Sequence, residues 1–590
     1  MSYLKAPRLH FAGQFRTQVS TVNNHATHFQ NINNPNEPGW NPSGSGSWGI
    51  SGCTVRGAIY ADGTVARTSA DDPVVGMAFV QSGSARLVDL DPEQQLASQI
   101  WGLQLQLGAT GPAFKGAFKT TAFSDIWSNR AQVPGGGDFK MSAFFHSVLT
   151  AVIWGDLSNS RFLGQLKQAS ASGLLSVKFN VDGFDQAART GRIVGTIGAA
   201  AADEPAHFVV GRQCMGRTEG PVWFFPALLD EQRGKLIADF GNALQTTSVG
   251  GPFDSTLDLQ IGLVRGEQNF SSFGRVPIGP AGWYEQTAGI CEFPTDRSLS
   301  AAELDELKKT PIGVAQQTGG ATSVVASEGV DGLHVRADEF VYRLSAKDTV
   351  SVTLRASSFG QPLPNTSIAL ASDSSGLQQG PGDPDVGAPP DGLSFQANLT
   401  TDAKGLISAV LTAGSIQKPR DYIDGQIYGV RYAVVGTDPE TGSYFNPADF
   451  ISVLVWTDYA APKEPTWRAD VQPILSQYAN LYPVMKPIVD LSNYDSVVAS
   501  KARMQMVFSL PAEDPRYMPV TRDLSPAKRE MILNWLSSTG NAGKPNLDVT
   551  LPEPMRPPLV AAAAPVEVRD DVMALGDKMA ALQHRRNQLA

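Results

Sequence analysis

Cysteine is scarce in this sequence. Its 590 residues include three cysteines, Cys53, Cys214 and Cys291. Their number is odd, and none lies at the short spacing from another that a disulfide framework or a zinc knuckle requires. We interpret them as buried free thiols, because a nucleophilic cysteine also needs a neighbouring base, which the sequence does not indicate.

Excess positive charge, long apolar runs and a leader pattern are also missing. The 47 Lys and Arg residues are outnumbered by 57 Asp and Glu, for a net charge of −10. We therefore predict no nucleic-acid binding, because no broad basic surface remains to neutralise a phosphate backbone. No run of about 18 apolar residues is present to span a bilayer, and residues 1–15 lack the pattern of a signal peptide. The expectation is a cytoplasmic protein that binds no membrane.

The common signatures of catalysis are absent too. The sequence contains no Walker phosphate loop, no G-x-S-x-G elbow and no H-E-x-x-H zinc motif. Residues 44–49 formally match the glycine pattern of dinucleotide-binding proteins, but polar and proline-containing residues precede them instead of a buried strand. This segment is predicted to be a loop.

What is present predicts a multi-domain, mainly β protein. The chain is several times longer than a usual domain of about 100–200 residues, and its 57 Gly and 40 Pro punctuate short apolar runs. Residues 1–332 are predicted to be a β-rich region of one or two subdomains. Two helices are expected within it. Residues 92–101 follow a potential cap at Asp91, and residues 300–309 begin with a capping box that uses Glu303.

Residues 333–462 read as one immunoglobulin-like β-sandwich. Residues 401–412 resemble the turn and strand of bacterial immunoglobulin-like repeats. A long loop at 376–392 carries Asp383, Asp385 and Asp391; a calcium site is the alternative to a solvated loop, although the acids lack the regular spacing of a calcium loop. Strands are predicted at 339–343, 349–356, 367–371, 406–412, 428–435 and 450–456.

The C-terminal part changes to helical patterns. Residues 463–540 are predicted to form a small helical domain, with helices at 469–479, 495–506 and 525–537. A linker rich in proline and alanine follows at 541–566. Residues 567–590 are predicted to form an amphipathic helix. Its apolar stripe at 567–589 is expected to dock on this chain or on a partner protein, because a lone helix of this length is marginal in water.

Few residues are candidates for chemistry. His25 and His28, three residues apart in an Asn-rich loop, are potential metal ligands or solvated histidines. Asp89 and Asp91 belong to the densest polar cluster of the first region, and this cluster also includes residues 99–102. Together with His10, the two aspartates are candidates for acid–base catalysis or metal binding. The alternative for the two aspartates is a helix cap and a turn.

Part of the helical region resembles a small c-type cytochrome domain. The matching segments are 471–475 (VQPIL), 489–494 (VDLSNY), 518–519 (MP) and 524–536. In that family a C-x-x-C-H segment attaches heme, and the Met-Pro pair supplies the distal ligand. The corresponding slot here, 479–483 (ANLYP), has neither thiol nor imidazole, so the resemblance implies a degenerate, heme-less domain without a cofactor.

A second resemblance extends over most of the chain. The order of its motifs is similar to the region that precedes the ferritin-like domain in the iminophenylpyruvate dimer synthase and chromopyrrolate synthase family. The resemblance implies that, in that family, the later ferritin-like helices carry out the oxidative chemistry on amino-acid-derived imines. Beyond Gly540 this sequence has no pair of helices with Glu-x-x-His. The matching segments are 7–13 (PRLHFAG), 88–92 (VDLDP), 99–100 (QI), 195–198 (GTIG), 211–212 (GR), 517–519 (YMP), 521–522 (TR) and 524–525 (LS).

These observations lead to three hypotheses. The first is a non-catalytic accessory or interaction protein that acts with a separate partner. The alternative is a stand-alone enzyme of secondary metabolism, an oxidoreductase on an amino-acid-derived metabolite with its site near His10, Asp89 and Asp91. The third is a secreted or surface binding module, suggested by the immunoglobulin-like sandwich.

Overall fold

The structure is a computed structural model of the full chain. It describes all residues except 1, 19–43, 92–93, 95–96, 136, 218–219, 267–268, 378–384, 418–419, 421–422, 438–448, 541–542 and 548–590. The predicted metal ligands His25 and His28, the loop residue Asp383, most of the linker and the C-terminal helix at 567–590 therefore lie outside the described residues.

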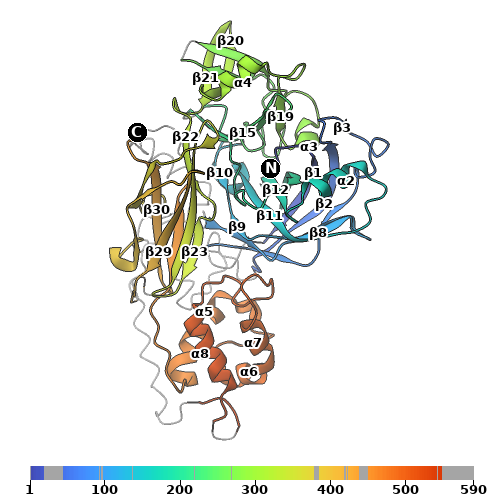
Figure 1. The fold of residues 1–590 in the computed structure, drawn as a ribbon. Helices are drawn as coiled ribbons and strands as arrows, with labels where there is room; N and C mark the ends of the chain where they lie inside the picture. The colour runs from blue at the N-terminus through green and yellow to red at the C-terminus, as the bar shows by residue number, and fades with distance from the viewer. Residues whose placement is uncertain are drawn as a thin grey trace.

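The described chain is mainly β and contains several sheets, which confirms the predicted class (Figure 1). The largest sheet closes on itself. Eight antiparallel strands follow one another around it, and β2 then meets β4 through a bridge between Thr54 and Ala78 and a hydrogen bond from Val55 N to Met77 O of 3.0 Å. In order around the closed sheet, the strands are β4 (Phe79–Gln81), β7 (Gln104–Leu107), β8 (Phe114–Phe118), β11 (Ser142–Trp154), β12 (Leu175–Asp185), β13 (Thr190–Ala199), β1 (Arg8–Thr17) and β2 (Ser47–Ile59).

Aromatic side chains fill the interior of this closed sheet. Alternate residues of each strand point inward, and eight strands leave just enough room for side chains. Phe179 lies 5.5 Å from both Trp48 and Phe145, measured between ring centroids. The remaining elements of this part are β3 (Val65–Ala66), β5 (Ala85–Val88), β6 (Gln99–Trp101), β9 (Thr121–Ala122), β10 (Asp125–Trp127), α2 (Arg161–Ala169) and the 3₁₀ turn η2 (Asp138–Lys140).

An eight-stranded sheet packs on the outer face of β1 and β13, where Ala12 and Val194 join its core. The predicted helix at 300–309 is confirmed as α4 (Ala301–Leu307), with the capping box between Ser300 and Glu303. Its other elements are β14 (Arg212–Gly216), β15 (Phe225–Asp230), β16 (Lys235–Asp239), β17 (Leu259–Val264), β18 (Phe270–Arg275), α3 (Trp283–Thr287), β19 (Ile290–Phe293), β20 (Ile312–Thr318) and β21 (Ala321–Ser327).

The helix predicted at 92–101 is wrong in its C-terminal part. Gln99–Trp101 form strand β6, which pairs with β5 on one side and β9 on the other. The backbone N–H and C=O groups of this segment are paired with β5 and β9 by hydrogen bonds. The segment is therefore a strand, although Asp91 was expected to cap a helix there.

Two sheets with a shared core form a β-sandwich. Val352 and Leu354 of one sheet and Ile368, Val430 and Val453 of the other belong to one cluster of buried side chains. Each of the six predicted strands overlaps an observed strand. The sandwich contains β22 (Leu333–Ala337), β23 (Val341–Leu344), β24 (Thr349–Ser358), β25 (Gln361–Pro362), β26 (Ser367–Ser372), β27 (Leu393–Phe395), β28 (Asn398–Thr400), β29 (Leu406–Ala413), β30 (Gln426–Val434), β31 (Ile451–Val455) and the 3₁₀ turn η3 (Pro390–Gly392).

A small helical region completes the described chain (Figure 1). Trp467, Tyr494 and Trp535 pack against one another in tilted and edge-to-face arrangements, with ring centroids 5.4 to 6.1 Å apart. The helix predicted at 495–506 is divided at Ser500, and Ser525 precedes the last helix without donating or accepting a capping hydrogen bond through its side chain. The elements are η4 (Trp467–Val471), α5 (Gln472–Leu481), η5 (Pro483–Met485), α6 (Tyr494–Ala499), α7 (Lys501–Phe508) and α8 (Pro526–Ser537).

Candidate functional site

His10 lies on the outer face of the closed sheet. The strand register places His146, Lys178, Thr196 and His10 side by side across β11, β12, β13 and β1. His10 is 3% exposed. Burial lowers its pKa well below the ordinary value, and the positive charge of Arg8 lowers it further. His10 is therefore a neutral, buried side chain.

The same face carries a buried ion pair. Lys178 Nζ lies 2.9 Å from Asp239 Oδ2, and the Tyr3 hydroxyl donates a 2.7 Å hydrogen bond to the same oxygen. Burial lowers the pKa of Lys178, while the charge of Asp239 opposes this effect. The side chains of the pair are 2% and 1% exposed, so they act as an internal contact between the closed sheet and the second sheet.

Asp125 lies in the same layer without a cationic partner at ion-pair distance in the described chain. Its carboxylate accepts hydrogen bonds from Asn242 Nδ2 at 2.9 Å and Trp223 Nε1 at 3.3 Å. Burial raises the pKa of Asp125 to about 6, although both hydrogen bonds act in the opposite direction. This carboxyl therefore titrates near neutral pH.

Asp89 and Asp91 face a different neighbour, the β-sandwich. Asp91 forms an ion pair with Arg420, and the two side chains are 1% and 0% exposed. The carboxylate of Asp89 accepts a hydrogen bond from Ser98, and its backbone oxygen accepts one from Arg343 at 2.9 Å. The structure thus separates the two aspartates from His10, and Asp91 joins the N-terminal region to the sandwich.

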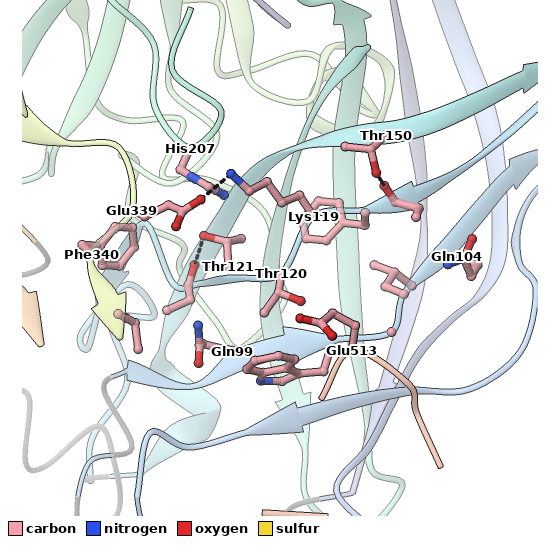
Figure 2. Close-up of a pocket in the computed structure, with 17 residues that line it drawn as sticks. Gln99, Gln104, Lys119, Thr120, Thr121, Thr150, His207, Glu339, Phe340 and Glu513 are labelled. Atoms are coloured by element: carbon pink, nitrogen blue, oxygen red, sulfur yellow. Dashed lines mark hydrogen bonds and ion pairs between the residues drawn. The ribbon is translucent and has the colours of Figure 1, made fainter. Parts of the chain in front are cut away.

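A pocket of 410 Å³ lies where three parts of the chain meet (Figure 2). Its walls come from the closed sheet, from residues 339–341 at the start of the sandwich, and from Glu513 of the helical region. Lys119 and Glu339 form an ion pair in its wall, with side chains 40% and 45% exposed. Pockets at domain junctions with a few polar groups in an apolar wall are typical ligand sites.

Gln99 and Trp101 of β6 form part of the pocket wall, and two arginines lie behind them. Arg343 donates a hydrogen bond from Nη1 to Gln99 Oε1. The guanidinium carbons of Arg343 and Arg522 lie 5.5 and 5.2 Å from the centre of the Trp101 ring. The polar cluster that the sequence indicated around residues 99–102 therefore lines this pocket, whereas its two aspartates are engaged elsewhere.

His207 also lines the pocket, next to Asp338. Its Nδ1 atom lies 3.4 Å from Asp338 Oδ1. Burial tends to raise the pKa of Asp338, but His207 and the backbone N–H groups of Ala206 and His207 lower it to about 2. Sequence reasoning did not identify Lys119, His207 and Glu339 as members of one site, because they belong to segments that only the fold brings together.

The three cysteines are free and buried, as predicted. Burial raises the pKa of Cys53 to about 11, and it also raises the pKa of Cys214 and of Cys291 well above the ordinary value. A thiolate is the reactive form of cysteine, so these groups are poor nucleophiles in the folded protein.

The slot of the cytochrome resemblance does not fit a tethered heme. Ala479 to Leu481 end helix α5, and Leu481 and Tyr482 are buried in the helical core. None of the slot residues has a thiol or an imidazole. Met518, the counterpart of the distal ligand, is half-buried next to Pro519.

The described residues contain neither a metal-binding cluster nor a membrane-spanning helix. No group of three His, Cys, Asp or Glu side chains in this part of the chain has the arrangement to hold a metal ion. None of its helices combines the length and the apolar character needed to cross a membrane.

Comparison with known proteins gives weak structural likenesses. No family model matches the sequence, and no curated protein matches it. The D00-D0 domain of intimin is 10% identical over 34% of this chain and 77% of its own, with a TM-score of 0.15. The D0-D1 domain of intimin is 11% identical over 38% and 92%, with a TM-score of 0.14. EndoBT-3987 of Bacteroides thetaiotamicron with Man5GlcNAc product is 14% identical over 24% and 37%, with a TM-score of 0.17. TM-scores this low establish no shared fold.

Proposed function

We propose that this chain is a non-catalytic accessory or interaction protein, related to the oxidative dimer synthases of aromatic secondary metabolism, that acts with a separate protein partner. The observation that supports this proposal most is the ion pair between Asp91 and Arg420, because it uses a sequence-predicted catalytic acid as a buried contact between domains. His10 is likewise buried and neutral. In this proposal the sandwich is immunoglobulin-like, residues 463–540 are a degenerate cytochrome-c-like domain, and the protein is cytoplasmic.

The apolar stripe at 567–589 is the proposed contact with the partner. The test uses the tagged full chain and a separately expressed ferritin-like di-iron protein of the dimer synthase family, analysed by size-exclusion chromatography with light scattering. We expect co-elution that is lost in Leu575→Asp, which places a charge on the stripe, and kept in Gln588→Asp, which lies on the opposite face of the expected helix. Co-elution that both variants retain, or none with the unmodified chain, contradicts the proposal.

The pocket favours a second candidate, the stand-alone enzyme. Lys119 and Glu339 bring a cation and a carboxylate to a cavity of 410 Å³, a size that admits a small metabolite. In this alternative an amino-acid-derived metabolite binds in the pocket, where Lys119 and Glu339 serve as acid–base groups, and its electrons pass to a separate small-molecule oxidant such as dioxygen. Turnover by the purified chain without any partner distinguishes the two proposals.

A further inference from the structure

Two guanidinium groups lie behind the pocket wall without a carboxylate partner. In the described part of the chain, neither Arg343 nor Arg522 forms an ion pair, and Nε of Arg343 is buried without a hydrogen-bond acceptor. Buried charges in proteins are normally paired, because removal of water from a charge is strongly unfavourable. Arg522 instead donates to backbone oxygens of Ala512 at 3.0 Å, Val520 at 2.6 Å and Asp514 at 3.0 Å.

The surroundings do not neutralise these two charges by direct contact. Burial lowers the pKa of Arg343 and of Arg522 to about 10, and the charge of Arg343 lowers the pKa of Arg522 further. Both remain protonated at neutral pH. The carboxyl that acts most strongly on Arg343 is Asp523, which accepts its hydrogen bonds from Tyr478 at 3.0 Å and Thr521 at 2.5 Å. Positive charge thus accumulates on the far side of Trp101.

Gln99 lies between Arg343 and the pocket, so the positive charge of Arg343 acts on the pocket through the Gln99 amide. Its side-chain oxygen accepts the hydrogen bond from Arg343, so the amide nitrogen is the end that it presents to the cavity, and Figure 2 shows this nitrogen directed toward Thr121. A hydrogen bond received at the amide oxygen polarises the amide and makes its N–H groups stronger donors. Thr120 and Thr121 add hydroxyl groups nearby, and Trp101 and Phe118 add apolar wall.

We propose that the junction pocket binds a small organic anion, whose carboxylate or phosphate accepts hydrogen bonds from the amide nitrogen of Gln99 and is stabilised by Arg343 and Arg522 behind it. The apolar portion of the ligand lies along Trp101 and Phe118. Within the described chain, the charges of Asp523 on Arg343 and of Glu513 on Arg522 act without forming an ion pair, and the ligand adds a further negative charge on the pocket side. The proposal holds whether or not the protein acts with a ferritin-like partner.

The test is isothermal titration calorimetry of the full chain at low ionic strength, with sodium benzoate and inorganic phosphate as probes. We expect saturable binding of one benzoate per chain. Gln99→Glu keeps the shape of the side chain but puts a carboxylate beside Arg343, so it is expected to weaken benzoate binding at least tenfold and to raise the melting temperature. Gln361→Glu adds the same charge at an exposed position of β25, outside the pocket wall, and is expected to change binding about twofold or less.

The outcomes separate clearly. Loss of benzoate binding in Gln99→Glu alone, with both variants folded by circular dichroism, supports the proposal. Binding of neither probe, or equal benzoate binding by the unmodified chain and Gln99→Glu, overturns it. Binding of phosphate without benzoate overturns the assignment of an organic ligand.

Discussion

The Asp91→Asn substitution leaves the shape of the side chain nearly unchanged but removes the negative charge that faces Arg420. The two side chains are 1% and 0% exposed, so the substitution removes the Asp91 carboxylate charge from a buried guanidinium. Breaking a buried ion pair in this way costs about 3–5 kcal/mol of unfolding free energy. Because the contact joins the N-terminal region to the sandwich, we expect both parts to lose stability.

The matched control is Asp62→Asn. Asp62 pairs with Arg161 at 3.2 Å, and these side chains are 52% and 62% exposed. Exposed pairs of this kind contribute little to stability, since water and salt screen them. Guanidinium unfolding curves, followed by tryptophan fluorescence and circular dichroism, compare the two variants in the full chain.

The double variant Asp91→Leu with Arg420→Met provides a second control. Replacing both charges by apolar groups is often neutral or stabilising, so we expect recovery to within about 1–2 kcal/mol of the unmodified protein. If Asp91→Asn loses no more stability than Asp62→Asn, the contact with Arg420 is not structural. Asp91 then becomes a candidate catalytic acid again.

Three further predictions concern other buried groups. Burial raises the pKa of Asp125 to about 6, so the folded state holds this proton more tightly than the unfolded state, whose pKa is 3.8. The contribution of Asp125 to stability is therefore greatest below pH 3.8 and is lost as pH rises through 6. Urea unfolding at about pH 5 and about pH 8 should show a loss of roughly 1.5 kcal/mol, absent in Asp125→Asn. Ellman's reagent should react only slowly with the thiols of the native chain, because all three are buried. After unfolding in guanidinium it should react with all three thiols, and a fast reaction with the native chain contradicts their burial. Trp535→Ala, at a fully buried residue, should cost the helical region about 3–5 kcal/mol in thermal unfolding followed by circular dichroism, and a smaller loss contradicts close packing around Trp467.

The strands of the sandwich were predictable because their local pattern agrees with their environment. In β29, alternate residues such as Ile407, Ala409 and Leu411 are buried, which produces the period of two that the sequence displays. The helix at 525–537 was predictable from proline at its first position. Residues 92–101 show the limit of this approach, since pairing of β6 with distant strands determines their structure.

The candidate site was less predictable because it depends on contacts between distant segments. Asp91 and Arg420 are separated by 329 positions in the sequence, and no local sequence pattern predicts that they pair. The pocket brings Gln99, Lys119 and Glu339 together from different parts of the chain. The sequence identified polar residues around 99–102 as a cluster, but their role as pocket wall follows only from the way three distant parts of the chain pack together.

A turnover measurement shows whether this chain carries out the oxidation itself or acts only together with a partner. The purified full chain is incubated with an amino-acid-derived imine, generated from the amino acid by an added oxidase, and products are followed by mass spectrometry with and without the separately expressed ferritin-like protein. We expect no product from the chain alone, and a changed rate or product distribution when both proteins are present. Sustained turnover by the chain alone would show that it is itself the catalyst.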